Sequence, residues 1–336
     1  MNGKYGLLLV CATFLFCWPA LAFTQLVSDS AAPPQSNSSL AAQVPAPTPT
    51  PVPAPDTHPA LPPPGPPPPA DFKNLIPADQ LSFLNDYANQ PTKVLLKDKR
   101  FHDLIKQDIS RTQYHYGRDM PLSDAVQTAL EDTKLPVLVR DGRFVTVSGN
   151  NGPYLDGRTF LWFDMQTGVA LGAFYFHPTN GEPSPTITVF SRQLTDRELS
   201  MSQLPEPFAE DLDQWMADAR IPEVTPRYFI PENGKKYVLA HDEDYCWHPP
   251  GTLAPDPVAC QQMNASAADD DMNAAYFMQR TGNSANATAW MLGADQVAWV
   301  DFRDRSCGIG LACRIRVTRQ RTRVLMGHSP APHGGR

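Results

Sequence analysis

Proline decides which part of this chain can fold. Residues 31–70 contain 16 prolines in 40 positions, with Ala, Thr and Ser between them. Proline has no backbone N–H, and a segment of this composition has too few large apolar side chains to build a core. We therefore expect residues 23–71 to form an extended, disordered spacer and the folded protein to begin at Phe72.

The residues before the spacer indicate export. Lys4 precedes an apolar run from Tyr5 to Trp18, which ends in Pro19-Ala20-Leu21-Ala22. A positive start, an apolar centre and a small-residue exit are typical of a secretory signal peptide. We predict a signal peptide over residues 1–22 and a periplasmic or secreted location. An uncleaved anchor is the alternative, because the run is nearly long enough to span a bilayer, and only then would the protein contact a membrane.

The cysteines agree with an oxidising compartment. Four of the six lie outside the predicted signal peptide, all in the last third of the chain: Cys246, Cys260, Cys307 and Cys313. An even number in an exported chain favours two disulfides, and the spacing alone leaves all three pairings open. A zinc site is the alternative, but zinc sites use closely paired cysteines and these spacings are wider. We predict disulfides and no metal site.

The formal net charge of −7 excludes one class of partner. Nucleic-acid-binding proteins need a basic surface, so we expect no nucleic-acid partner. A cationic protein suits this charge better.

The spacing of apolar residues from 72 to 240 predicts an α+β domain, in which helices pack on an antiparallel sheet. Helical spacing covers residues 76–90, 101–109, 121–133 and 207–221. A period of two predicts hairpins over residues 136–149, 158–178 and 227–246, and a further strand over 186–194. Their turns are expected at Asp141-Gly142, at residues 166–168 and at Asn233-Gly234.

Residues 241–327 predict a small disulfide-bonded helical domain, followed by a disordered tail over 328–336. Helical spacing covers residues 260–280 and about 289–303, with a polar interruption at 281–288, and a third helix begins near Cys313. The expected fold class is α+β: an antiparallel-sheet domain with packed helices, then the helical domain.

Ordered residues in this segment resemble the LprI-type lysozyme-inhibitor domain. The run Asp270-Asp271-Met272-Asn273-Ala274-Ala275-Tyr276 is similar to the family's D-x-L-N-x-x-Y, with Met272 in place of the usual leucine. The family's L…Q-x-x-W…R-D…C is matched by Leu292, Gln296, Trp299, Arg303, Asp304 and Cys307. Cys313 and the arginines after it resemble the start of its last helix, and the resemblance covers about residues 245–327.

The resemblance implies a helical hairpin in which the start of the first helix lies beside the end of the second. On this arrangement we expect Cys260 to pair with Cys307, which leaves Cys246 to pair with Cys313. The function of the family, inhibition of lysozyme, comes to this chain only by analogy.

The signature residues are expected to hold the hairpin together. Arg303, one turn after Trp299, is expected to lie over its indole ring. Gln296, Asp270 and Asn273 are expected to satisfy polar groups across the seam between the helices.

Other clusters favour structural roles. His241 to His248 is rich in possible metal ligands, but neighbouring side chains on a strand point to opposite faces, so we interpret it as a solvated acidic turn. Asp269, Asp270 and Asp271 suit the first turn of a helix or a cationic partner. The arginines from Arg314 to Arg323 predict an internal charge network.

No motif supports catalysis. The loop 148–158 lacks the helix that a phosphate loop needs, and His177 has no nucleophile motif nearby. We therefore predict no catalytic residue and no cofactor.

The sequence favours an exported, non-catalytic cell-envelope protein that binds and inhibits lysozyme or a related muramidase through its helical domain. Residues 281–288 and 308–312 are the candidate occluding loops. The alternative is a structural or adaptor module whose α+β domain binds a peptide or assembly partner. A third hypothesis, an envelope hydrolase, requires hydrolysis by the purified protein. The sequence assigns neither a role to residues 72–240 nor an oligomeric state.

Overall fold

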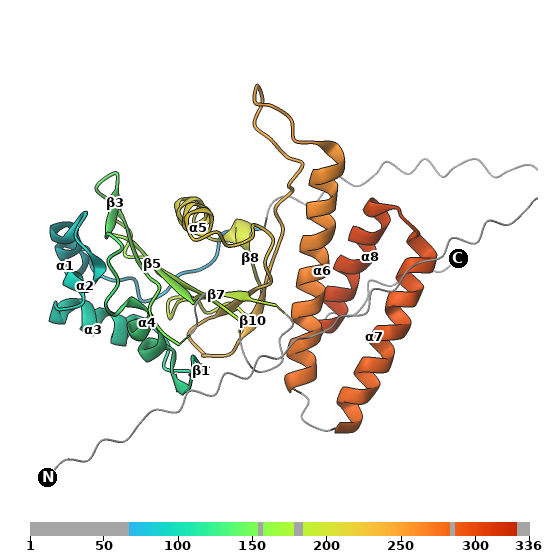
Figure 1. Ribbon diagram of the computed structural model, residues 1–336, viewed down its shortest axis with the longest axis horizontal. Helices are drawn as coiled ribbons and strands as arrows, with labels where there is room; N and C mark the ends of the chain where they lie inside the picture. The colour runs from blue at the N-terminus through green and yellow to red at the C-terminus, as the bar shows by residue number, and fades with distance from the viewer. Residues whose placement is uncertain (1–66, 154–156, 178–183, 283–285, 328–336) are drawn as a thin grey trace, which may run out of the picture. The chain divides into compact units, whose positions relative to one another are not determined.

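A mixed β-sheet forms the centre of the folded part of the chain (Figure 1). The computed structural model describes residues 67–153, 157–177, 184–282 and 286–327. The predicted signal peptide, nearly all of the spacer and the predicted tail lie outside these residues. The eight described strands of the sheet follow the order β3-β4-β5-β6-β7-β9-β10-β8.

The strands agree with the period-two segments of the sequence, except for the two-residue strand β8, which was not predicted. They are β3 (Leu138–Arg140), β4 (Phe144–Gly149), β5 (Arg158–Asp164), β6 (Ala170–Phe176), β7 (Thr186–Phe190), β8 (Leu199–Ser200), β9 (Arg227–Ile230) and β10 (Tyr237–Ala240). A separate antiparallel pair, β1 (Gln113–His115) and β2 (Asp119–Pro121), was not predicted. The three predicted hairpins, β3–β4, β5–β6 and β9–β10, are confirmed. Gly142, Gly168 and Gly234 lie in their turns with φ of 62°, 79° and 70°, a region that favours glycine.

The α+β class is confirmed, but the sheet also contains two parallel pairs. β7 runs parallel to β9, and β8 runs parallel to β10. Parallel neighbours need a crossover connection. The chain between β7 and β9 supplies it through the 3₁₀ turn η2 (Met201–Gln203) and helix α5 (Glu206–Asp218).

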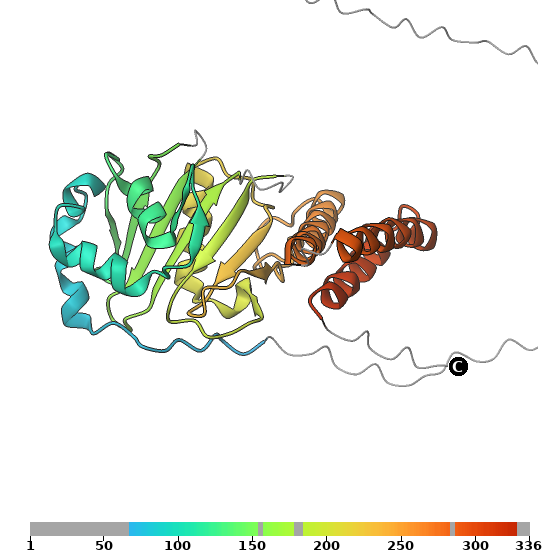
Figure 2. The ribbon, with the colours of Figure 1, turned by 90° about the horizontal axis from the view of Figure 1, so that it is seen from below.

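Helices cover both faces of the sheet (Figure 2). One face packs against α1 (Ala78–Leu81), the 3₁₀ helix η1 (Ser82–Tyr87), α2 (Thr92–Leu95), α3 (Lys99–Asp108) and α4 (Leu122–Leu130). The other face packs against α5. Each face of the sheet has its own hydrophobic core, and strand β5 contributes to both. Its Leu161 and Phe163 lie in the core on the first face, and Phe160 and Trp162 lie in the core on the second. A strand buried on both faces explains the continuous apolar run at this position.

Three long helices follow the sheet: α6 (Pro257–Gly282), α7 (Asn286–Cys307) and α8 (Leu311–Leu325). Helix α6 packs on α8 and on β9 and β10, through a core that joins Tyr228 and Val238 of the strands to Met272 and Leu325 of the helices. It begins three residues before the predicted start, because Asp256 caps it by accepting hydrogen bonds from the backbone N–H groups of Val258 and Ala259. None of the described helices is long and apolar enough to cross a membrane.

The predicted disulfide pairing is wrong. The structure joins Cys246 to Cys260 and Cys307 to Cys313, so each disulfide closes a local loop. The expected pairing assumed that α6 starts level with the end of α7, but α6 packs mainly on α8 and extends further. The segment after β10 runs back to the start of α6, which places Cys246 beside Cys260 with a Cα–Cα distance of 4.9 Å. The short turn between α7 and α8 places Cys313 beside Cys307 with a Cα–Cα distance of 5.4 Å.

Candidate functional site

A polar seam centred on Arg303 ties the three long helices together. Its side chain is buried, and Nη1 donates to Oδ1 of Asp269 on α6 at 2.8 Å. Arg303 Nε donates to Oδ1 of Asp304 at 3.1 Å, and Thr318 of α8 donates to the same Asp269 oxygen at 3.3 Å. Asp269 therefore accepts from both α7 and α8, which fixes the axial positions of the helices.

The arginines of α8 continue this network, but the carboxylates that Arg314 and Arg321 contact, Asp304 and Asp295, belong to α7 and not to the acidic first helix, α6. Trp299 lies near two guanidinium groups, with the Cζ atoms of Arg303 and Arg321 at 5.2 and 5.7 Å from its ring centroid. Arg321 donates to Gln296 at 3.1 Å and to Asp295 at 2.6 Å. The expected contact between Arg303 and Trp299 is present, and the network is internal.

Two signature residues do not take the positions expected of them. Asn273 is exposed, and the contact to Arg303 is made by Asp269 rather than by Asp270. Burial raises the pKa of Asp270 to about 6; Asp271 and Asp269 push it in the same direction, and His241 opposes them. Leu292 and Tyr276 pack beside Met272 in the core that α6 shares with the strands.

The segment after β10 is only partly the solvated acidic turn that the sequence suggested. His241 is buried, and its backbone N–H and Nδ1 contact the two carboxylate oxygens of Asp271 at 2.9 and 2.6 Å. Asp242 and Asp244 follow the end of β10 at Ala240 and are exposed, as expected of a solvated acidic segment. Glu243 pairs with Arg227, whose side chain is 2% exposed.

Arg227 is a buried charged residue that the sequence interpretation missed. The available signal was a single arginine within the otherwise apolar strand RYFI. Within the described part of the chain, no group of three or more His, Cys, Asp or Glu side chains is arranged to hold a metal ion.

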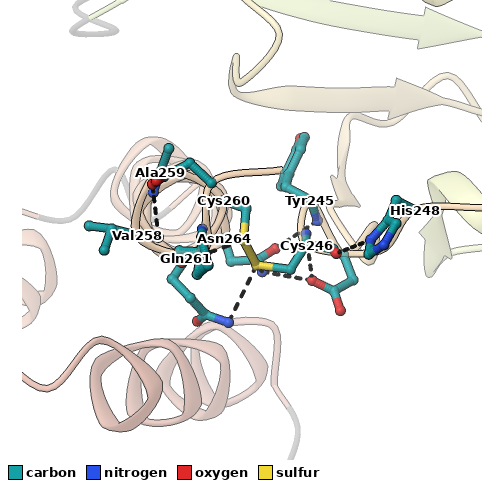
Figure 3. The surroundings of a disulfide bond; sticks show 11 residues. Tyr245, Cys246, His248, Val258, Ala259, Cys260, Gln261 and Asn264 are labelled. Atoms are coloured by element: carbon teal, nitrogen blue, oxygen red, sulfur yellow. Dashed lines mark hydrogen bonds between the residues drawn. A yellow bond between two sulfur atoms is a disulfide. The ribbon is translucent and has the colours of Figure 1, made fainter. Parts of the chain in front are cut away.

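Two disulfide-closed loops carry the most exposed apolar side chains of the helical part. Ile309, between Cys307 and Cys313, is 97% exposed, and Leu253, between Cys246 and Cys260, is 96% exposed. Figure 3 shows the base of the second loop, where Asn264 of α6 accepts from the backbone N–H of Tyr245 at 3.2 Å and donates to Asp244 at 2.8 Å. Residues 283–285, within the other candidate loop, lie outside the described residues.

Comparison with known families identifies the helical part. Residues 252–325 match the model of the family described as Lysozyme inhibitor LprI, which confirms the resemblance found in the sequence. The rest of the chain matches no family model. Neither a comparison with curated proteins nor one with solved structures found a match.

Proposed function

We propose that this protein is an exported, non-catalytic component of the cell envelope that binds and inhibits a lysozyme or a related muramidase. The observation that carries the proposal is the LprI match over α6, α7 and α8. In this proposal residues 72–240 form an α+β domain, residues 241–327 form the inhibitory domain, and the signature residues hold its scaffold.

Charge and loop shape support inhibition by occlusion of a cleft. Lysozymes are typically basic proteins with an acidic catalytic cleft, and a net charge of −7 would steer this protein towards one. The loop 308–312 presents Ile309 to solvent and is closed by the Cys307–Cys313 disulfide. A loop held in one conformation loses little entropy on binding, which favours its insertion into a cleft.

The location follows from the same features. Two disulfides fit an oxidising compartment, which agrees with a periplasmic or secreted protein released from a signal peptide over residues 1–22. The proline-rich spacer would then hold the folded part away from a wall or membrane.

One observation favours the adaptor alternative. A cavity of about 510 Å³ lies between α5 and the β3–β5 end of the sheet, and its lining includes Leu138, Phe160 and Trp215. Leu138 is 49% exposed on the edge strand β3. An open, partly apolar cavity beside an edge strand suits a peptide ligand of the α+β domain.

A lysozyme activity assay separates the two functions. Mature oxidised protein is titrated into a cationic lysozyme, beside the same protein after reduction. The expected result is dose-dependent inhibition by the oxidised form that is weakened or lost on reduction. Absence of inhibition at high excess, with both disulfides formed, would contradict the inhibitor proposal and favour the adaptor.

A further inference from the structure

The disulfide-closed segment 247–259, called the loop 247–259 although its last three residues form the start of α6, exposes three large apolar side chains. Trp247, Leu253 and Val258 are 70%, 96% and 62% exposed. A single exposed leucine is ordinary, but several large apolar groups on one short projecting loop are typical of a contact surface. These side chains contribute little to the protein's own core, so their burial against a partner would be a net gain.

This loop is also preorganised. The Cys246–Cys260 disulfide closes it, and four of its positions are proline: Pro249, Pro250, Pro255 and Pro257. Thr252 hydrogen-bonds to the carbonyl of Pro249 through its backbone N–H at 3.2 Å and through its hydroxyl at 2.7 Å. Proline and the disulfide restrict the free loop, so the entropy lost on binding is small.

Along the chain, the charges around the loop have one sign, and Arg319 of α8 is a basic neighbour of Asp244. Residues 237–279 contain seven Asp and Glu residues and no Lys or Arg. Asp242, Asp244 and Asp256 among them are exposed close to the loop in the sequence. A surface of this sign attracts a cationic partner and repels an acidic one.

The two disulfide-closed loops project from the same end of the helices. Because Arg303 of α7 and Thr318 of α8 both contact Asp269 of α6, these three residues lie at about the same height along the helix axes. At about 1.5 Å per residue, α6 begins about 18 Å beyond this level, whereas α7 ends about 6 Å and α8 begins about 10 Å beyond it. Figure 1 shows the connection before α6 and the α7–α8 turn at this end, with the former reaching further. The loop 247–259 is therefore the part of the chain that reaches furthest at this end of the three helices.

We propose that the loop 247–259 is the principal contact surface for a cationic protein with a concave, partly apolar cleft, and that Leu253 is its anchor. The loop 308–312 contacts the same partner beside it. This inference rests on the proposed function and deepens it, because it names the surface that engages the muramidase. An exposed apolar loop with acidic residues on either side of it in the sequence is complementary to an apolar cleft in a basic protein.

The test compares binding and inhibition for three forms of the oxidised, mature protein, with a purified cationic lysozyme as the probe. We expect Leu253→Ser to weaken the Kd at least 30-fold, which corresponds to about 2 kcal/mol at about 1.4 kcal/mol per tenfold. Leu75→Ser is the matched control, because Leu75 is an exposed leucine (47%) before α1 in the sheet part, and its Kd should equal that of the wild type. Circular dichroism and thiol titration check that each variant is folded and oxidised.

Charge is tested separately with Asp256→Asn, which keeps the helix cap but removes the charge. We expect slower association, a weaker dependence of the association rate on salt, and little change in dissociation. If the wild type inhibits and Leu253→Ser inhibits equally well, this inference is wrong and the proposed function stands. If the wild type neither binds nor inhibits, the proposed function fails and the inference falls with it.

Discussion

At the scale of single residues, folding disfavours the ionised form of the Asp270 side chain. Burial raises its pKa to about 6, whereas an aspartate in an unfolded chain titrates near pH 4. Between these values the folded protein binds more protons than the unfolded one, so this residue's contribution to the free energy of unfolding falls as the pH rises from about 4 to 6.

Asp270→Asn should therefore stabilise the protein at pH 7. With allowance for the partial exposure of the side chain, we expect a gain of about 1–2 kcal/mol at pH 7 and almost none below about pH 4. Urea unfolding at pH 3.5 and pH 7 measures both values. An equal effect at the two pH values would show that the carboxylate charge is not the cause.

The buried guanidinium of Arg227 gives a second residue-scale prediction. Its side chain is 2% exposed, and that of its partner Glu243 is 33% exposed. Removal of one partner leaves a buried charge unpaired, so Glu243→Ala should lower the free energy of unfolding by about 2 kcal/mol. The exposed pair Arg305–Asp301, at 3.3 Å, is the control: Asp301→Ala should change it by less than about 0.5 kcal/mol. Similar losses in the two variants would contradict the burial argument.

At the scale of elements, α7 offers a comparison within one helix. Trp299 packs in the shared core and against two arginines, whereas Trp290 is 76% exposed. We expect Trp299→Ala to lower the free energy of unfolding by about 2–3 kcal/mol, since it removes a large, partly buried ring, and Trp290→Ala to change it by under about 0.5 kcal/mol. Urea unfolding of both variants tests this. A larger loss at Trp290 would mean that α7 is packed differently.

The elements that the sequence predicted are those set by short-range rules. Asn233-Gly234 specified a hairpin because both residues tolerate the backbone of a tight turn. The apolar spacing specified α5, and the ordered set from Asp270 to Cys307 identified the helical family. The hairpin and α5 each depend on residues within about 20 positions of one another, whereas the family signature is an ordered set that can be read along the chain without knowing the packing.

The features that could not be predicted from the sequence depend on how elements far apart in the chain pack against one another. The parallel pairing of β7 with β9 follows from how the α5 crossover packs on the sheet, which no local pattern states. The disulfides were mispaired because the choice depended on how far α6 extends past α7. The contact between His241 and Asp271 was missed for the same reason, since the two residues lie 30 positions apart along the chain.

At the scale of the whole molecule, the sheet and the helical part share a core and a buried polar contact. Tyr228 and Val238 pack with Met272, and His241 contacts Asp271. The boundary predicted between residues 240 and 241 therefore lies where contacts are buried rather than in an exposed linker. All described residues belong to one compact unit. We infer that the two parts unfold together.

Two core variants, one in the helical part and one beneath the sheet, test whether the two parts unfold cooperatively. Met272→Ala removes a buried side chain (4% exposed) of α6, and Leu212→Ala removes one (0% exposed) of α5 on the far face of the sheet. Each should cost about 2–4 kcal/mol. If the molecule unfolds as one unit, either variant lowers the hydrogen-exchange protection of the slowest amides in both β5 and α6 by the same free energy. If Met272→Ala affects only α6 and Leu212→Ala affects only β5, the parts are independent domains and the predicted boundary at 240–241 is correct. The result also bears on the proposed inhibition, because in a cooperative molecule the proposed contact loop 247–259 is anchored to a scaffold with the stability of the whole sheet.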